Sequence, residues 1–187
     1  ANLPEGAAGR GWMTLRKDDL PAIHIMTVLG RIFVTPPADD PFATVERLLD
    51  RLPETNPIVV VEIHAEATSE KRAMGWHFDG RVAAVIGTHT HVPTADAELL
   101  ARNTAYVTDL GMTGPYESII GRRIDRVLTH MTTAMAAPFD VATGDPRVCG
   151  VAIDIDPNTR RATHIERIEL PADVSAPPFA GTDDEDE

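Results

Sequence analysis

The sequence predicts an α/β domain with a mixed sheet and a β-hairpin towards its C-terminal end. In the middle of the chain, short β-branched apolar runs alternate with segments of helical periodicity, as in parallel strands joined by helices. Near the end, two β-rich arms at 148–156 and 162–170 flank Pro157-Asn158-Thr159-Arg160, which indicates an antiparallel hairpin. Together these patterns predict a layered domain.

The first half of the chain alternates strands with a helix. The helix is predicted because Asp40 and Pro41 supply an N-cap and a first-turn proline, and the apolar residues that follow share one face. The strand at 58–63 is an unbroken apolar run, typical of a buried parallel strand, and it ends at His64. The expected elements are a loop at 1–12, strands at 12–15 and 23–34 (the latter one strand or two broken near Gly30), a helix at 42–52 and the strand at 58–63.

The second half continues the alternation. Thr68 or Ser69 is expected to cap a helix that runs to Phe78 and stops at Asp79-Gly80. The two glycines and the proline of 109–116 predict a rigid loop. The other expected elements are strands at 82–86 and 105–108, a short helical turn at 94–96, a helix at 122–131, an irregular segment at 134–145 and little order after 171.

Composition restricts the class of protein. The chain has 187 residues, 43% of them apolar and 25% charged, which fits one soluble globular domain. A formal charge of −12 argues against general binding to nucleic acid. No run is long and apolar enough to cross a membrane, and Cys149 is the single cysteine, so a cytoplasmic protein without intrachain disulfides is expected. Its oligomeric state is left open, with a homo-oligomer as one possibility.

Three histidines follow the buried strand candidates. His64 ends the run at 58–63, and His89 and His91 lie in Gly87-Thr88-His89-Thr90-His91 after the run at 82–86. Imidazoles at the carboxyl ends of neighbouring parallel strands suggest a metal site at one edge of the sheet. The alternative is that each ring only forms hydrogen bonds with nearby backbone, as single histidines at strand ends usually do.

Several longer motifs occur in a fixed order, and together they resemble the YmdB-type bacterial calcineurin-like metallophosphoesterases, a family of 2′,3′-cyclic-nucleotide phosphodiesterases. The motifs are His64-Ala65-Glu66-Ala67-Thr68-Ser69-Glu70-Lys71, Asp79-Gly80-Arg81-Val82, Gly87-Thr88-His89-Thr90-His91-Val92, Thr94-Ala95-Asp96 and Thr108-Asp109-Leu110-Gly111-Met112-Thr113-Gly114-Pro115-Tyr116. The resemblance extends from the first residues to the terminal hairpin. It implies a four-layer αββα sandwich with a two-metal centre at the strand ends.

The resemblance also implies roles for individual residues. His64 and His89 would bind one metal ion and His91 the other, the ions being Fe, Mn or Zn, which imidazoles suit. Two such ions can hold a phosphodiester and activate water. Four residues are weaker candidates for contacts with the small phosphodiester substrate, each with a purely structural alternative: Thr88, Thr90, Met112 and Tyr116.

Two departures from the family's pattern matter. The family usually has Asp two residues before the first histidine, where this chain has Glu62. This position is more typical of an outer contact, a residue that hydrogen-bonds a metal ligand, than of a ligand itself. The family's N-terminal motifs, which supply an Asp ligand, a bridging Glu, a metal-binding Asn and the histidine that serves as general acid, do not occur here. The chain also begins without Met.

Residues 1–172 are therefore expected to be the C-terminal portion of one metallophosphoesterase domain, and 173–187 a disordered acidic tail. On its own the chain is expected to be inactive, and a missing N-terminal half or a partner is expected to cover the exposed sheet. The alternative is a non-catalytic truncated homologue that binds a metal or a partner. A mononuclear hydrolase would need further carboxylate ligands that the sequence does not identify.

Four acids near these motifs have open roles. Glu66 and Glu70 are either outer contacts of the histidines or solvated acids at a helix start. Asp96 and Asp109 are either turn-forming or catalytic.

Overall fold

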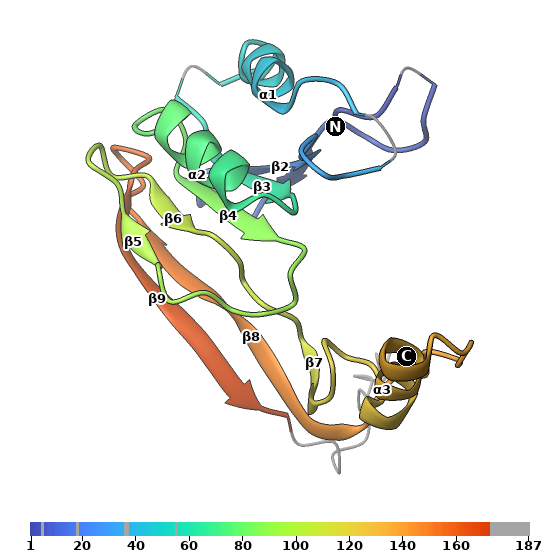
Figure 1. Cartoon of the computed structure of the whole chain (residues 1–187). Helices are drawn as coiled ribbons and strands as arrows, with labels where there is room; N and C mark the ends of the chain where they lie inside the picture. The colour runs from blue at the N-terminus through green and yellow to red at the C-terminus, as the bar shows by residue number, and fades with distance from the viewer. Residues whose placement is uncertain (5, 18, 36–37, 55, 173–187) are drawn as a thin grey trace, which may run out of the picture. The chain divides into compact units, whose positions relative to one another are not determined.

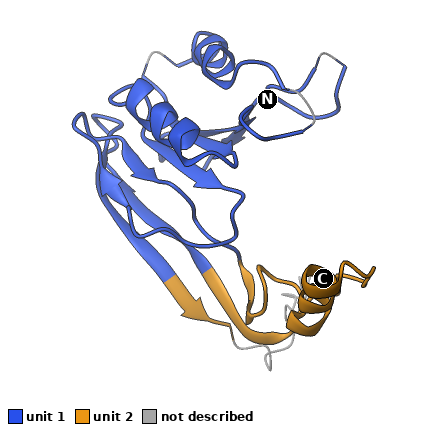
Figure 2. Ribbon diagram, in the orientation of Figure 1, with its two compact units in different colours: residues 1–112, 149–168 blue, residues 113–148, 169–187 orange. Residues whose placement is uncertain are grey.

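The structure is a computed structural model that describes residues 1–172 except 5, 18, 36, 37 and 55 (Figure 1). The described chain forms two compact units (Figure 2). Unit 1 comprises Ala1–Met112 and Cys149–Ile168, and unit 2 comprises Thr113–Val148 and the chain from Glu169. The predicted acidic tail at 173–187 lies outside the described residues.

A mixed six-stranded sheet forms the centre of unit 1, as the sequence predicts. Strands β2, β3, β4 and β6 are parallel, whereas β1 and β5 pair antiparallel at the two edges. The strand order is β1-β2-β3-β4-β6-β5. The bounds are β1 Met13–Leu15, β2 Ile23–Leu29, β3 Ile58–His64, β4 Ala84–Thr88, β5 Glu98–Leu99 and β6 Ala105–Val107.

Strand β2 ends at Leu29, so the part of the predicted strand beyond Gly30 is wrong. At Gly30 the chain turns across the end of β3, where the Gly30 amide donates to the carbonyl of His64 at 2.9 Å. A Cβ at this position would lie 2.3 Å from Glu70 Oε2 and 2.5 Å from the Ala65 Cβ. The strand therefore stops where the backbone must approach its neighbours closely.

Two helices cover one face of this sheet, α1 at Pro41–Leu49 and α2 at Thr68–His77 (Figure 1). The predicted cap of α1 is confirmed, because Asp40 accepts hydrogen bonds from the amides of Phe42 and Ala43 at 2.8 and 3.1 Å. The predicted cap of α2 is wrong. The turn after β3 is so short that Thr68 is already helical, and Ala67 takes the cap position without a side-chain hydrogen bond among the described residues.

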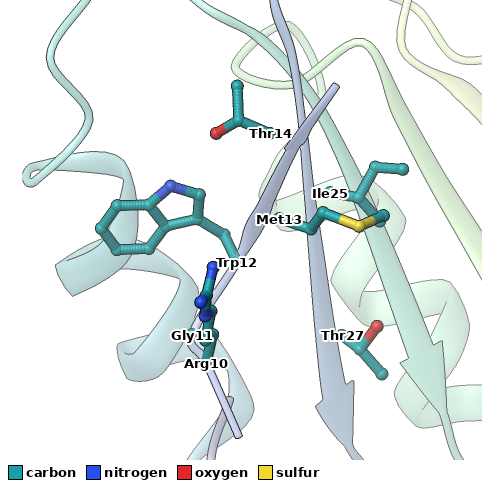
Figure 3. Close-up of a pocket in the computed structure, with 7 residues that line it drawn as sticks. All are labelled: Arg10, Gly11, Trp12, Met13, Thr14, Ile25 and Thr27. Carbon is teal, nitrogen blue, oxygen red and sulfur yellow. The ribbon is translucent and has the colours of Figure 1, made fainter. Parts of the chain in front are cut away.

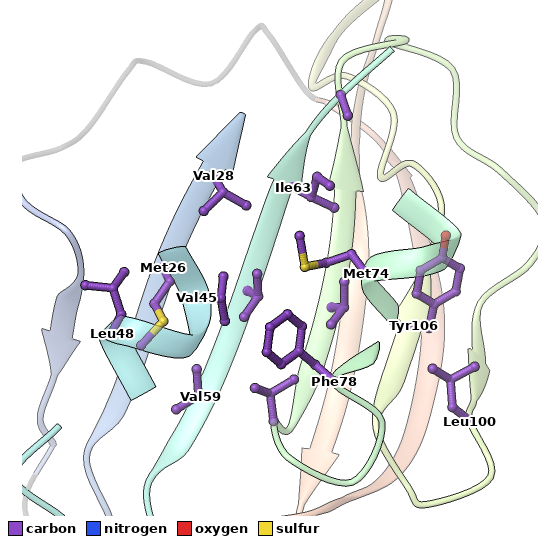
Figure 4. Packing of buried hydrophobic residues seen from close by; sticks show 14 of the residues in the cluster. Met26, Val28, Val45, Leu48, Val59, Ile63, Met74, Phe78, Leu100 and Tyr106 are labelled. Carbon is purple, nitrogen blue, oxygen red and sulfur yellow. The ribbon is translucent and has the colours of Figure 1, made fainter. Parts of the chain in front are cut away.

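The main core lies between these helices and the sheet. Met74 and Phe78, from α2 and the residue after it, pack over Val59 and Ile63 of β3 with no exposed surface (Figure 4). Burying one such side chain contributes about 1.5–3 kcal/mol. This cluster fixes β3 beneath α2 and so fixes the position at which His64 leaves the sheet.

The part of the C-terminal hairpin that belongs to unit 1, Cys149–Ile168, packs on the other face of the sheet. The arms of the hairpin are β8 at Gly144–Ile155 and β9 at Ala162–Pro171, which confirms the predicted hairpin. Three buried alanines, Ala84, Ala105 and Ala162, form the contact within unit 1 and allow a close approach of the two layers. Within unit 1, helices, sheet and this part of the hairpin give three successive layers.

The hairpin contact lies at the β4–β6 end of that face, and the β1–β2 end is more open. Met13 and Leu15 there are 54% and 47% exposed. An open cavity of about 700 Å³ follows β1 and β2 and includes Trp12, Met13 and Ile25 in its lining (Figure 3). Of the described histidines, none lines it, but Thr27 does, and Thr27 also donates a hydrogen bond to Glu62 at 2.8 Å.

Unit 2 contains β7 at Gly114–Glu117, which pairs antiparallel with the first part of β8, and α3 at Ile124–Thr133. The predicted rigid loop at 109–116 thus ends in a strand, because its last residues extend along β8.

In unit 1, the predicted helical turn at 94–96 is also wrong. Thr94 and Asp96 instead form hydrogen bonds with each other and with Thr108 and Asp109, which follow β6. Across the described residues, no helix has the length and apolarity that a membrane crossing requires.

Candidate metal centre

The site begins at the carboxyl ends of β3 and β4. These parallel strands pair in a register that sets His64 directly opposite Thr88. On β3, Glu62 lies two residues before His64 and therefore projects to the same face of the sheet. The pairing explains why side chains from separate motifs meet at one edge.

Backbone geometry then places the two histidines of the following loop. Gly87 lies so close to β6 that a Cβ would be 1.8 Å from the carbonyl oxygen of Thr108. Beyond it, His89 and His91 have φ angles of 115° and 66°. Such angles are strained for residues other than glycine, at about 1–3 kcal/mol each, and they persist only where surrounding contacts impose them.

His64 and His89 point at each other. Nε2 of His64 lies 3.1 Å from Nδ1 of His89, with the rings nearly perpendicular at 81°. Two imidazole nitrogens that are neighbouring ligands of one transition-metal ion, each about 2.0–2.1 Å from it, lie roughly 3 Å apart. The donor atoms and their separation therefore suit a shared ion.

The ring nitrogens that do not face the other histidine, Nδ1 of His64 and Nε2 of His89, are hydrogen-bonded to neighbouring side chains. These side chains are outer contacts, which orient the imidazoles without binding a metal ion themselves. Nδ1 of His64 lies 3.0 Å from the Thr88 hydroxyl, which donates to Glu62 at 2.9 Å. Nε2 of His89 lies 2.8 Å from a carboxylate oxygen of Glu66. Glu62 and Glu66 are thus outer contacts of the pair, whereas Glu70 accepts from the Arg31 amide.

The surroundings of His64 favour its neutral form. Burial lowers the pKa of His64, and the neighbouring His89 lowers it further, against the opposing effect of Glu62. A neutral imidazole is the form that binds metal ions. The electrostatics and the geometry therefore point to the same use of this ring.

A buried ion pair, missed by the sequence reasoning, supports the histidine loop. Lys71 and Asp109 are 0% and 1% exposed, and their charged atoms lie 2.9 Å apart. The same oxygen of Asp109 accepts from the Thr90 amide at 2.9 Å, which ties the loop between the two histidines to α2. Burial opposes ionisation of Asp109, but the hydrogen bonds from Lys71 and Thr90 outweigh it and lower its pKa.

Helical spacing could have revealed Lys71. It lies three and seven residues before Met74 and Phe78, on the face that α2 buries, and a lysine at such a position requires a buried partner. Asp96 is also structural, since it accepts from the Thr94 hydroxyl and from the amide and hydroxyl of Thr108.

With this geometry established, sequence comparison identifies the family. The model of the family described as "YmdB-like protein" matches residues 1–168. The chain belongs to this family. One relative is a 2′,3′-cyclic-nucleotide 2′-phosphodiesterase of Bacillus subtilis (strain 168), 45% identical over 168 residues that cover 90% of this chain and 63% of the relative. Another is a putative phosphatase/phosphodiesterase of Mycoplasma pneumoniae, 34% identical over 81% of this chain and 54% of the relative.

Solved structures agree with this YmdB-like assignment. A hypothetical protein from Thermus thermophilus superposes with a TM-score of 0.83 and 40% identity, covering 91% of this chain and 65% of that one. A novel phosphatase from Mycoplasma pneumoniae gives 0.82 and 31%, covering 91% and 62%. In each of these four comparisons, the chain thus spans less than two thirds of the matched protein.

The other predicted site residues of this YmdB-like chain belong partly to unit 1 and partly to unit 2. His91 is exposed, and its carbonyl accepts from the Met112 amide at 3.2 Å. The Thr90 hydroxyl donates to the Val92 carbonyl at 3.2 Å. Tyr116 belongs to unit 2, where its ring lies under the guanidinium of Arg147. Among the described residues, no three His, Cys, Asp or Glu side chains form a group that could hold a metal ion.

Proposed function

We propose that this chain provides the histidine-bearing part of a metal-dependent phosphoesterase that hydrolyses phosphodiesters such as 2′,3′-cyclic nucleotides. The observation that carries the proposal is the convergence of His64 Nε2 and His89 Nδ1 at 3.1 Å, with the other nitrogen of each ring bound by an outer contact. The names of the two relatives, a cyclic-nucleotide phosphodiesterase and a putative phosphatase/phosphodiesterase, support the substrate class.

The chain's own residues have distinct tasks in this proposal. His64 and His89 would hold one divalent Fe, Mn or Zn ion, and His91, two residues along the strained loop, would bind a second. Bound divalent ions neutralise the charge of a phosphodiester and activate water for its hydrolysis. Lys71 and Asp109 hold the loop in register, so that the imidazoles are in place before the substrate arrives. Thr90, Met112 and Tyr116 remain candidates for substrate contacts.

His89→Ala in the full gene product tests the function. The expected result is a loss of 2′,3′-cyclic-nucleotide hydrolysis on the order of 100-fold or more, together with a lower metal content, because a ligand is removed. His164→Ala is the matched control, since this histidine lies on β9 and its side chain is 57% exposed. Unchanged turnover by the His89 variant would refute the assignment.

A second candidate function is a non-catalytic module that binds a metal or a partner. The small number of metal ligands favours it over an enzyme for the chain alone, because the described residues hold no group of three or more His, Cys, Asp or Glu side chains around one point. Intact mass and metal content of the protein from its natural source distinguish the two. A mass well above that of this chain with about two metals supports the enzyme, and a mass equal to this chain with one metal or none supports the module.

A further inference from the structure

The Thr88 hydroxyl has two hydrogen-bond partners, the Glu62 carboxylate and the His64 ring, and of these only the carboxylate is unable to donate. An ionised carboxylate only accepts hydrogen bonds, so Thr88 donates to Glu62 Oε1 at 2.9 Å. A hydroxyl has a single proton, and the Thr88 oxygen therefore presents lone pairs to Nδ1 of His64, 3.0 Å away. The ring must donate this bond. His64 then carries its proton on Nδ1, and Nε2 is left with a free lone pair.

The same reasoning gives the other tautomer for His89. Its Nε2 lies 2.8 Å from Glu66 Oε2, which again only accepts. His89 therefore carries a proton on Nε2, and its Nδ1 has the free lone pair. In this arrangement the two bare nitrogens are the two that face each other at 3.1 Å.

Two lone pairs at that distance repel, so the hydrogen bonds to Thr88 and Glu66 hold the rings together against a repulsion that a bound cation would remove. We propose that the Glu62–Thr88 pair and Glu66 are positioning residues that impose opposite tautomers on His64 and His89, so that Nε2 of the first and Nδ1 of the second bind one metal ion. The inference rests on the proposed function for the presence of the metal. The tautomers themselves follow from the hydrogen bonds of the chain.

The sheet explains how this hydrogen-bonded chain is held in register. Glu62 is paired with Thr27 across β2 and β3, and His64 with Thr88 across β3 and β4. Thr27 donates to the second oxygen of Glu62 at 2.8 Å, which prevents that carboxylate from turning away from Thr88. Three neighbouring parallel strands thus align four side chains in one row. The glutamate that departs from the family's usual aspartate is long enough to bridge two threonines.

Thr88→Val, introduced into the full gene product, removes the hydroxyl and keeps the shape of the side chain. Without it, the proton of His64 is expected to move to Nε2, where the bare Nδ1 of His89 becomes its acceptor. Long-range ¹H–¹⁵N NMR of the histidine rings reports the tautomer directly, on metal-free protein at about pH 8, where imidazoles are neutral. Zn²⁺ affinity, measured by chelator competition, is expected to fall about 10–100-fold, as for other outer contacts of metal-binding histidines.

Thr88→Ser should restore both the tautomer and the affinity, because it returns the hydroxyl. Thr14→Val is the matched control. Its hydroxyl lies 3.0 Å from Nδ1 of His24, a second threonine–histidine pair, on β1 and β2, and its loss should leave Zn²⁺ affinity unchanged. Glu62→Gln provides a second variant should Thr88→Val fail to fold, and it is expected to weaken Zn²⁺ binding in the same direction.

The outcomes separate this inference from the proposed function. An unchanged His64 tautomer and unchanged Zn²⁺ affinity in Thr88→Val would overturn the positioning role, while metal binding and hydrolysis by the wild type would stand. A wild-type protein with the two opposite tautomers but no affinity for Zn²⁺, Mn²⁺ or Fe²⁺ would support the hydrogen-bond reasoning and overturn the proposed function.

Discussion

The buried Lys71–Asp109 pair allows a quantitative prediction for Lys71→Met. Removing one partner of a buried ion pair usually costs about 3–5 kcal/mol, because the other charge stays in the interior without compensation. Methionine keeps most of the volume of the lysine stem. Asp109 keeps the hydrogen bonds from the amides of Thr90 and Gly111. We therefore expect the lower end of the range, about 3 kcal/mol.

Asp109→Asn should have the larger effect, about 5 kcal/mol. It leaves an ammonium group without a counter-charge and replaces an oxygen that two donors share. For a chain of this size, 1 kcal/mol corresponds to about 2–4 °C in Tm, so Lys71→Met should lower Tm by roughly 6–12 °C. Amide exchange at Thr90 should accelerate in Asp109→Asn, because its acceptor is changed.

Urea unfolding of the purified variants, followed by circular dichroism, measures these differences. Arg31→Met is the matched control, because the Arg31–Asp40 pair is about half exposed and such pairs contribute about 1 kcal/mol or less. The reasoning would be refuted if Lys71→Met cost less than about 1 kcal/mol, or no more than the control. That result would mean that the ammonium group reaches water in solution.

Two further predictions concern backbone packing and pH. Gly87→Ala should destabilise by at least about 3 kcal/mol, since its Cβ would meet backbone at 1.8 Å, whereas Gly150→Ala, with nothing within 4 Å, should change stability by less than about 1 kcal/mol; urea unfolding compares them. The hydrogen bond from Arg81, reinforced by His77 against the effect of burial, lowers the pKa of Glu46 from 4.5 to about 2. A lowered carboxyl pKa stabilises the fold above the ordinary pKa and loses this effect as pH falls towards 2, so Glu46→Gln should cost about 1 kcal/mol or less at pH 7 and nothing near pH 2. An equal difference at both pH values in unfolding titrations would contradict this explanation.

Local signals in the sequence were sufficient for much of the fold. Asp40 and Pro41 predict the start of α1, and the structure shows the capping hydrogen bonds. The apolar run at 58–63 predicts a buried strand that ends at His64, as β3 does. These features depend on neighbours in the chain, which is why periodicity and capping chemistry reveal them.

Features that depend on distant partners were not predicted. The strand β7 exists because 114–117 finds the edge of β8, some thirty residues later, and its own composition indicates only a turn. The convergence of His64 and His89 was suggested by their positions after two neighbouring strand candidates, and only the resemblance assigned them to one ion. The sequence does not show that Thr88 lies opposite His64, because the register of β3 and β4 is a tertiary property.

The strained backbone at His89 and His91 has an evolutionary consequence. Glycine or asparagine would adopt these φ angles at lower energy. Histidine at each of the two positions therefore lowers the stability of the fold by about 1–3 kcal/mol. A lineage that no longer needed the imidazoles would gain stability with its first substitution here, and drift would soon remove them. The loop should therefore be among the earliest parts of the protein to change in a descendant that has lost the reaction, well before its core.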